Sequence, residues 1–280
     1  SRPASGSGAE RKFGRFFPTD AEREHMSRSV GVVVPAYRPD VDRLSRYVCA
    51  LDERLAPAEL RIELDDPAPG DREALADLPA TVHVADRRRG KGAAITEGFD
   101  ALDTDVLAFS DADGSTPAES IADVIDPVAS GEFDLAAGSR RHPEATVQSH
   151  QKTLRRFLGD AFAWLARQLL DPDLYDYQCG AKAVSANFWS RLRRHLTESG
   201  FAWDIELLAI AGALGGRIAE VPVVWEDQPE STVDPVSDTL SMFTGLLTAR
   251  HRAKAVRGDR LHELLAARVD QPLLIERGGR

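Results

Sequence analysis

The stretch Val106-Leu107-Ala108-Phe109-Ser110-Asp111-Ala112-Asp113 joins a short apolar run to two carboxylates. An apolar run of this length predicts a buried strand. Open α/β sheets bind ligands at the carboxyl ends of their strands, so we expect Asp111 and Asp113 to lie at a binding site. Their hard oxygen atoms suit Mg²⁺ or Mn²⁺ holding a diphosphate. The alternative interpretation of the triplet is a solvated turn, and the other segments of the chain decide between the two.

Strands and helices alternate around this stretch. Apolar patterns predict strands at residues 30–34, 60–64, 81–84, 106–110 and 133–137. Helical spacing predicts helices at 41–55, 71–78, 92–102 and 117–125, the first of them capped by Asp40. Strand, helix and strand at this spacing indicate right-handed βαβ units. The predicted fold class is therefore α/β, with a mostly parallel, Rossmann-like sheet flanked by helices.

The second half of the chain is organised differently. The patterns predict helices at 154–170, 186–196 and 204–214, a loop or short edge strand at 176–182, and a strand at 217–225 in which Pro222 marks an edge or a bulge. We expect residues 26–235 to form the main domain and residues 236–280 a C-terminal amphipathic helical segment. Residues 1–25 are interpreted as a tag or flexible arm, with a native arm as the alternative.

The C-terminal segment carries a basic stretch in an otherwise acidic protein. This stretch contains Arg250, Arg252, Lys254 and Arg257. It has two interpretations, a core-facing helix with a solvated end or a helix on a membrane surface. No run in the sequence approaches the roughly 18 apolar residues of a membrane-spanning helix. Any contact with a membrane is therefore expected to be peripheral.

The composition argues against some functions. The chain has 280 residues, of which 42% are hydrophobic and 29% charged, as in an ordinary globular protein. A formal net charge of −10 argues against nucleic acid as a partner. The two cysteines, Cys49 and Cys179, lie far apart in the sequence and form no metal-binding pattern. We expect both to be reduced thiols in a reducing compartment.

Polar residues also follow the other predicted strands. Pro35-Ala36-Tyr37 follows the first and is suited to hold a nucleobase between backbone and ring. Asp65-Asp66 follows the second, where a carboxylate can accept hydrogen bonds from a uracil N–H or from ribose hydroxyls; a turn with a helix cap is the alternative. A basic loop then places Gly90 and Lys91 at a helix start, where backbone N–H groups and cations face an anion. An exposed basic loop is the alternative there.

Several segments in this order resemble family 2 glycosyltransferases with the GT-A fold, over about residues 29–225. They are most similar to the branch that makes polyprenyl-phosphate sugars, the dolichyl-phosphate glucose and mannose synthases. The segments are residues 32–37, 89–94, 111–115, 138–140, 178–182, 203–207 and 220–225. Gln178-Cys179-Gly180 is similar to the glucosyl branch, whereas Pro67 follows Asp66 where the family usually has Gly-Ser.

The resemblance implies inverting transfer of a sugar from a nucleotide diphosphate sugar, with UDP-glucose favoured, to a polyprenyl phosphate for glycan or glycoprotein assembly. In this family Mg²⁺ or Mn²⁺ neutralises the leaving diphosphate; here Asp113 would hold it, assisted by Asp111 and Ser115. The nucleotide-sugar site implied in this sequence comprises Pro35, Ala36, Tyr37, Asp65, Asp66, Gly90, Lys91, Asp111, Ala112 and Asp113.

The implied acceptor is a lipid phosphate, which is already an anion and needs positioning more than a strong base. Arg140, Arg155 and, as a third cation, Lys182 would bind this phosphate. Asp204 would orient the sugar hydroxyls or a cation such as Lys182. The partners would be a nucleotide sugar, a polyprenyl phosphate and the cytoplasmic face of a membrane. One alternative is transfer to a polysaccharide or glycolipid hydroxyl, in which case Asp204 becomes the base; another is a catalytically silent nucleotide-sugar-binding scaffold.

Overall fold

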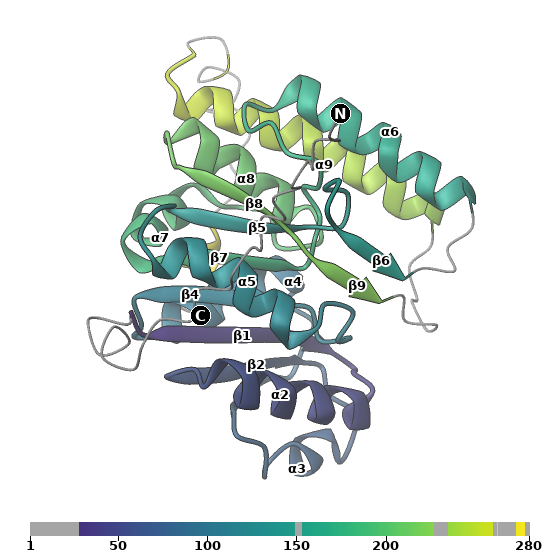
Figure 1. Cartoon of the computed structure of the whole chain (residues 1–280), viewed down its shortest axis with the longest axis vertical. Helices are drawn as coiled ribbons and strands as arrows, with labels where there is room; N and C mark the ends of the chain where they lie inside the picture. Colours follow the sequence, from purple (N-terminus) through teal and green to yellow (C-terminus); the bar gives the residue numbers. More distant parts are fainter. Residues whose placement is uncertain (1–27, 149–152, 227–234, 260–261, 263–272, 278–280) are drawn as a thin grey trace, which may run out of the picture.

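The computed structural model describes residues 28–148, 153–226, 235–259, 262 and 273–277. At residue 148 and within residues 153–158, 235–241 and 276–277 it describes the backbone alone. The described chain forms a large sheet covered by helices on both faces, with a small second sheet beside it (Figure 1). The predicted tag or arm at residues 1–25 lies outside the described residues.

The main sheet is mixed. Its strand order is β3-β2-β1-β4-β7-β5-β8, and neighbouring strands run parallel except at β7, which is antiparallel to both β4 and β5. A short parallel pair, β6 and β9, forms the second sheet. The strands are β1 (Val30–Tyr37), β2 (Glu59–Asp65), β3 (Thr81–Ala85), β4 (Val106–Ser110), β5 (Leu135–Ser139), β6 (Thr146–Gln148), β7 (Ala181–Ser185), β8 (Ile218–Pro222) and β9 (Val224–Glu226).

Helices pack on both faces of the main sheet. Helices α2 and α5 contribute to the hydrophobic core on one face, and α4, α6, α7, α8 and α9 to the core on the other. Helices α6 and α9 lie side by side at the top of Figure 1. The helices are α2 (Val41–Leu55), α3 (Asp71–Ala74), α4 (Lys91–Ala101), α5 (Ala118–Ala129), α6 (Thr153–Leu169), α7 (Ala186–Leu192), the 3-10 turn η1 (Arg193–His195), α8 (Trp203–Ala213), α9 (Pro235–Val256) and α11 (Leu274–Arg277).

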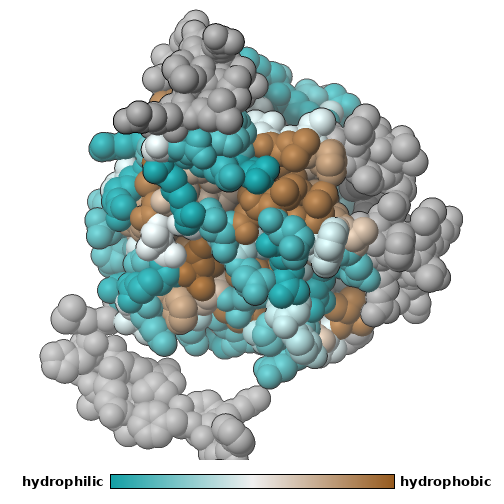
Figure 2. Space-filling view, turned by 90° about the horizontal axis from the view of Figure 1, so that it is seen from above, coloured by the Kyte–Doolittle hydropathy of each residue, from teal (hydrophilic) through white to brown (hydrophobic). Residues whose placement is uncertain are grey.

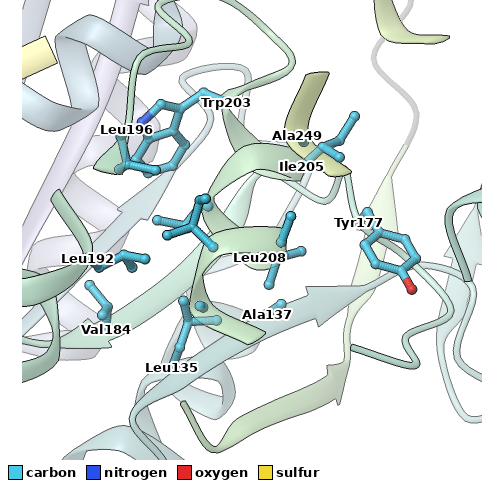
Figure 3. Close-up of a cluster of buried hydrophobic side chains, with 14 of the residues drawn as sticks. Leu135, Ala137, Tyr177, Val184, Leu192, Leu196, Trp203, Ile205, Leu208 and Ala249 are labelled. Atoms are coloured by element: carbon cyan, nitrogen blue, oxygen red, sulfur yellow. The ribbon is translucent and has the colours of Figure 1, made fainter. Parts of the chain in front are cut away.

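Strand β1 contributes to both cores, because successive side chains of a strand point to opposite faces. Val32 and Val34 pack toward α2 and α5, whereas Val33 packs on the other face. That other core includes Trp203 and Leu208 of α8 (Figure 3). Helix α8 is buried along most of its length, since the sheet lies on one side of it and α9 on the other. This packing fixes the first turn of α8, which enters the candidate site.

The α/β prediction is confirmed in most elements. Helix α2 and strand β4 have the predicted bounds, and the Asp40 side chain accepts a hydrogen bond from the backbone N–H of Arg43 at 2.9 Å, as an N-cap does. Strand β8 lies at the edge of the sheet and ends at Pro222, as the proline predicts. Cys49 and Cys179 are free thiols.

The structure corrects several predicted bounds. Strand β7 begins at Ala181 and occupies the middle of the sheet, whereas the sequence predicts a loop or edge strand at 176–182. Lys182 interrupts the apolar run of this strand, which is why the pattern does not reveal it. Helix α5 continues through Pro127 to Ala129, because a proline in the last turn removes only one backbone hydrogen bond. The strand predicted at 217–225 is two strands, separated at Val223.

The contacts of α9 distinguish the two interpretations of the basic stretch, as far as the structure describes this stretch. Leu246, Ala249 and Ala253 lie in the core, and the guanidinium of Arg252 is 2.9 Å from the carboxylate of Glu206 on α8. This is the core-facing helix. The same helix exposes large apolar side chains on its outer side, among them Phe243. None of the described helices is both long and apolar enough to cross a membrane.

Candidate active site at the carboxyl edge of the sheet

Chain segments from both halves of the sequence meet where β1, β2 and β4 end. Strand β7 runs antiparallel to β4, and the pairing of Ser110 with Ala181 places residues 178–180 beside Asp111. The backbone N–H of Asp111 donates to the carbonyl of Gly180 at 2.9 Å. Helices α4 and α8 also begin at this edge, because the side chain of Lys91 reaches that of Asp204 at 2.9 Å. The segments 89–94, 111–115, 178–182 and 203–207 are thus neighbours in space.

The two aspartates after β4 have different surroundings. Asp111 has an exposed side-chain fraction of 42%, and its Oδ1 lies 2.9 Å from the ammonium of Lys91. Its pKa is raised, since partial withdrawal from water and the nearby carboxylates of Asp113 and Asp204 outweigh the effect of Lys91. Asp113 is exposed, and its Oδ1 accepts a hydrogen bond from the backbone N–H of Ser115 at 2.9 Å. The loop thus presents carboxylate oxygens to the solvent.

These residues fit a divalent metal whose remaining ligands are supplied by the substrate. Mg²⁺ is usually held by one or two carboxylates together with substrate phosphates and water. Asp111 and Asp113 supply two carboxylates, and Ser115 adds a buried hydroxyl whose Oγ has no hydrogen-bond partner within the described part of the chain. The described residues contain no group of three or more His, Cys, Asp or Glu side chains that could hold a metal. The donor set therefore suits Mg²⁺ or Mn²⁺ bound together with a diphosphate.

Gly180 leaves the space that the Asp111 carboxylate occupies. A Cβ atom at position 180 would overlap Oδ2 of Asp111, far inside van der Waals contact. We therefore expect Gly180→Ala to displace this carboxylate and to reduce activity about a hundredfold, the cost of a misplacement of about 1 Å at a reacting centre. Initial rates of purified variants measure the effect. The double variant Gly180→Ala, Asp111→Ala should be no slower than Asp111→Ala alone; additive losses would show that Gly180 acts elsewhere.

Asp204 lies between two lysines. Its Oδ1 is 2.7 Å from the ammonium of Lys182 and its Oδ2 is 2.9 Å from that of Lys91. Lys182 and Asp204 each expose only 2% of their surface. Burial alone would raise the pKa of Asp204, but the two ammonium groups outweigh it and the pKa is lowered. The ammonium groups also lie near the ring of Phe109, that of Lys91 at 5.3 Å and that of Lys182 at 5.8 Å from the ring centroid.

The predicted pairing of Asp204 with Lys182 is therefore present in the structure. The additional partner, Lys91, comes from the other half of the chain, and no local pattern in the sequence indicates it. Lys182 also donates a hydrogen bond to the carbonyl of Cys179 at 2.7 Å. The structure thus places Lys182 beneath the site surface, whereas the sequence suggests a cation that touches an acceptor phosphate.

Asp65 holds the basic loop in place. Its Oδ2 accepts hydrogen bonds from the backbone N–H groups of Arg89 and Gly90 at 2.6 Å and 3.2 Å, and its Oδ1 accepts from Nε of Arg89 at 2.7 Å. The guanidinium of Arg89 also meets Glu63 of β2 at 2.8 Å and Glu97 of α4 at 2.6 Å. Asp65 thus uses both oxygens within the protein. Asp65 therefore positions the loop that leads into α4, of which Gly90 is the N-cap residue.

Tyr37 and Asp66 lie at the rim of the site. Tyr37 is exposed, and the guanidinium of Arg88 lies 4.3 Å from the centre of its ring. The Asp66 carboxylate is 2.7 Å from the guanidinium of Arg38 and is partly exposed. Asp66 adopts a φ of 46°, a left-handed conformation that turns the chain away from β2. Ala36 is buried, so it can present only its backbone to a ligand.

Tyr47 contacts the residues on either side of the loop at residues 111–115, which carries the two aspartates. The sequence does not predict Tyr47 as a site residue. This α2 side chain is buried, and its hydroxyl lies 2.5 Å from Oγ of Ser110 and donates to the carbonyl of Thr116 at 2.7 Å. The hydroxyl thus connects the residues before and after the loop. Burial raises the pKa of Tyr47 beyond its ordinary value, so the hydroxyl keeps its proton. The helical pattern of residues 41–55 places Tyr47 on the buried face but gives no sign of this contact.

Arg140 follows β5, as predicted, and is engaged by Asp176. Its Nε and Nη2 lie 2.7 Å and 3.1 Å from the two oxygens of that carboxylate, and 27% of its side chain is exposed. The pKa of Asp176 is lowered although burial opposes this, chiefly because of the Arg140 guanidinium. The ring of Trp225 lies 5.8 Å from the same guanidinium. The side chain of Arg155 lies outside the described residues.

The sequence between β1 and α7 matches the family model named Glycosyl transferase family 2, over residues 32–188. The chain belongs to this family. The mostly parallel sheet, the helices on both faces and the carboxylates after β4 together form its GT-A fold.

The names of several curated relatives mention a dolichyl phosphate or a polyprenol. The chain is 33% identical over 228 residues to Glycosyltransferase AglD of Haloferax volcanii, covering 78% of this chain and 36% of that protein. It is 32% identical over 224 residues to Polyprenol monophosphomannose synthase of Mycolicibacterium smegmatis, covering 76% and 77%. It is 27% identical over 251 residues to human Dolichyl-phosphate beta-glucosyltransferase, covering 81% and 76%. The chain thus spans about a third of the length of the Haloferax protein, and about half of the length of two further relatives, the Dolichyl-phosphate beta-glucosyltransferases of Dictyostelium discoideum and Mus musculus.

Solved structures share the fold. Glucosyl-3-phosphoglycerate synthase from Mycobacterium tuberculosis in complex with UDP superposes with a TM-score of 0.62 at 18% identity, covering 80% of each chain. A second structure of that synthase, with Mn²⁺, UDP and phosphoglyceric acid, superposes with a TM-score of 0.60 at 17% identity, covering 80% of this chain and 78% of the other. At this identity the likeness establishes the fold alone.

Proposed function

We propose that the protein transfers a sugar, with UDP-glucose the favoured donor, to a polyprenyl phosphate with inversion at the anomeric carbon. The observation that carries this proposal is the contact of the Lys91 ammonium with Asp111, two residues before the exposed Asp113, at the carboxyl edge of the sheet. Two carboxylates and one cation suit a metal-bound diphosphate. The names of the relatives support the lipid phosphate as acceptor.

The donor side of the site is built to stabilise a leaving diphosphate. When bound, a divalent metal held by Asp113 and Asp111 would neutralise the charge that develops on the diphosphate. The chain itself adds Lys91 and the backbone N–H groups at the start of α4, which favour an anion. Tyr37 and Asp66 stand at the rim, where we place the nucleobase and ribose. The ion pair between Arg89 and Asp65 holds the basic loop before α4 in place.

The state of Asp204 favours a phosphate acceptor over a hydroxyl acceptor. A hydroxyl nucleophile needs a general base, and a base must accept a proton in the course of the reaction. Both oxygens of Asp204 are held by lysines and its pKa is lowered, so it is a poor proton acceptor. A lipid phosphate attacks as an anion and needs cations to position it. Arg140 is partly exposed at the end of β5 and is our candidate for this role, together with Arg155.

An apolar surface is available for the lipid tail and the membrane. The exposed fraction of Trp164 on α6 is 63%, and Phe243 and Leu247 on α9 are also exposed. Helices α6 and α9 pack against each other, and Figure 2 shows brown apolar areas on the face seen from above. Exposed apolar side chains grouped on neighbouring helices are typical of surfaces that contact lipid or a partner. We propose that this face contacts the cytoplasmic side of a membrane.

A screen of nucleotide sugars tests the proposed function. The purified protein is incubated with Mg²⁺ or Mn²⁺, a radiolabelled nucleotide sugar and a polyprenyl phosphate, and label is counted in the organic phase. We expect label transfer from a uridine diphosphate sugar, fastest with glucose. Faster transfer from guanosine diphosphate mannose would refute the donor assignment. Metal-dependent UDP binding without transfer to any acceptor would support the silent scaffold.

Arg140 and Arg155 should affect the acceptor and not the donor. The loss of one charge-assisted contact with a phosphate costs about 1.5–3 kcal/mol, so alanine at either position should weaken acceptor use roughly ten- to a hundredfold. The measurement is the Michaelis constant for each substrate. Lysine at either position should rescue only partly, because a point charge cannot replace a planar fork.

Arg140→Ala also leaves Asp176 without its partner, so thermal unfolding must accompany the kinetics. The matched control is Arg167→Ala on α6, which removes a surface ion pair with Asp173 and should leave both Michaelis constants unchanged. If Arg140→Ala and Arg155→Ala raise only the constant for the nucleotide sugar, the acceptor placement is wrong.

A further inference from the structure

The Lys91 ammonium lies against Oδ1 of Asp111, a carboxylate oxygen that could otherwise be a metal ligand. This ammonium is 2.9 Å from Oδ1 of Asp111 and 2.9 Å from Oδ2 of Asp204. The other oxygen of Asp111 lies against Gly180, where even a methyl group would overlap it. Asp111 therefore has a neighbour at each oxygen. Asp113, in contrast, is exposed, and within the described part of the chain its side chain receives a hydrogen bond from the backbone N–H of Ser115 alone.

An ammonium group and a divalent metal compete for one carboxylate oxygen, because both are cations attracted to the same charge. With Lys91 on Asp111, a metal has one fully available carboxylate, that of Asp113, and meets a positive charge beside it. The position of Lys91 would also allow its ammonium to bind a donor diphosphate in place of Asp111. Lys91 is the first residue of α4, after Gly90, where backbone N–H groups also attract a diphosphate. Asp204 remains its partner when Asp111 is released.

We propose that Lys91 couples metal binding to donor binding by exchanging Asp111 for the donor diphosphate. The exchange frees an oxygen of Asp111 for the metal, so that donor and metal each strengthen the binding of the other. This inference rests on the proposed donor site but not on the identity of the sugar or the acceptor. Linkage makes the coupling reciprocal, and couplings of this kind are typically about 5–150-fold in affinity.

Binding of Mn²⁺, followed by electron paramagnetic resonance in the presence and absence of UDP, tests this coupling without turnover. In the wild-type protein we expect weak binding of Mn²⁺ alone and an increase of about 5–150-fold with UDP. The decisive variant is Lys91→Met, which keeps the length of the apolar stem and removes the charge. It should bind Mn²⁺ more tightly than the wild type without UDP and gain less when UDP is added. These two changes have opposite signs, and a general loss of structure cannot produce both.

Two further variants serve as controls. Arg54→Met removes one positive charge from the exposed last turn of α2, away from the carboxyl edge, and should reproduce neither change. Asp113→Ala should lose Mn²⁺ binding in both conditions, which locates the measured ion. If Lys91→Met lowers Mn²⁺ affinity equally with and without UDP, or leaves both unchanged, the exchange is refuted. If the coupling is present but no acceptor is glycosylated, the coupling stands and the proposed transfer fails.

Discussion

Replacing Asp113 with alanine is expected to abolish measurable sugar transfer while the fold stays intact. Asp113 is exposed after a buried strand, and among the described residues its side chain accepts a hydrogen bond only from its own loop. Loss of one preorganised group that stabilises developing charge costs about a hundred- to a thousandfold in turnover. The loss should be larger here, because the metal and the diphosphate depend on the same oxygen. Exposed positions of this kind change the free energy of unfolding by about 0.5 kcal/mol or less.

Two measurements separate this role from a structural one. Asp123→Ala removes an exposed carboxylate from α5 and should keep full activity, so it controls for the change in net charge. An excess of chelator should inactivate the wild-type protein to the level of Asp113→Ala, and added Mn²⁺ should restore only the wild type. Full activity of Asp113→Ala, or of the wild type in chelator, would refute the metal mechanism.

The sequence predicts the parts of this site that follow from local pattern. Strand β4 is a continuous apolar run because it is buried on both faces. Asp111 and Asp113 lie at the carboxyl edge of the sheet because they directly follow this strand. Helix α2 follows from its apolar spacing and its Asp40 cap. These features depend on residues within one turn or one strand of each other. Local periodicity is therefore enough to place them.

Local sequence patterns do not predict contacts between segments that are distant in the chain. Lys91 and Asp204 are 113 positions apart, and their contact depends on how α4 and α8 pack on one face of the sheet. The Tyr47 hydroxyl reaches Thr116 across the other face. Asp65 illustrates a second difficulty, since a carboxylate at a strand end serves equally to bind a ligand or to hold the next loop. Only the position of Arg89 decides that it holds the loop.

Replacing Asp204 with asparagine should produce the largest loss of stability of any conservative change in the site. The substitution keeps the size of the side chain but leaves Lys182 fully buried with no negative partner and removes one of the two partners of Lys91. Breaking a buried ion pair by removal of one partner costs about 3–5 kcal/mol. Urea unfolding of the purified proteins measures this cost. Activity should fall as well, because Lys91 loses the partner that holds it near the diphosphate site.

A neighbouring carboxylate supplies the control for general destabilisation. Glu206 is also buried on α8, where its oxygens accept hydrogen bonds from the backbone N–H groups of Thr197 and Glu198 and pair with Arg252 of α9. Glu206→Gln should therefore lower stability but retain turnover at temperatures where it is folded. Equal turnover losses in Asp204→Asn and Glu206→Gln would mean that Asp204 has no role beyond folding.

The pH dependence of this loss has a defined sign. The pKa of Asp204 in the folded protein is below its ordinary value of 3.8, since Lys182 and Lys91 outweigh the effect of burial. A carboxylate with a lowered pKa contributes stability above its unfolded pKa and loses it as the pH falls through the folded value. The difference in unfolding free energy between the wild type and Asp204→Asn should thus be constant near neutral pH and shrink below about pH 4. A difference that grows on acidification would show that Asp204 is protonated in the folded protein, and the lysine pair would then need another counter-charge.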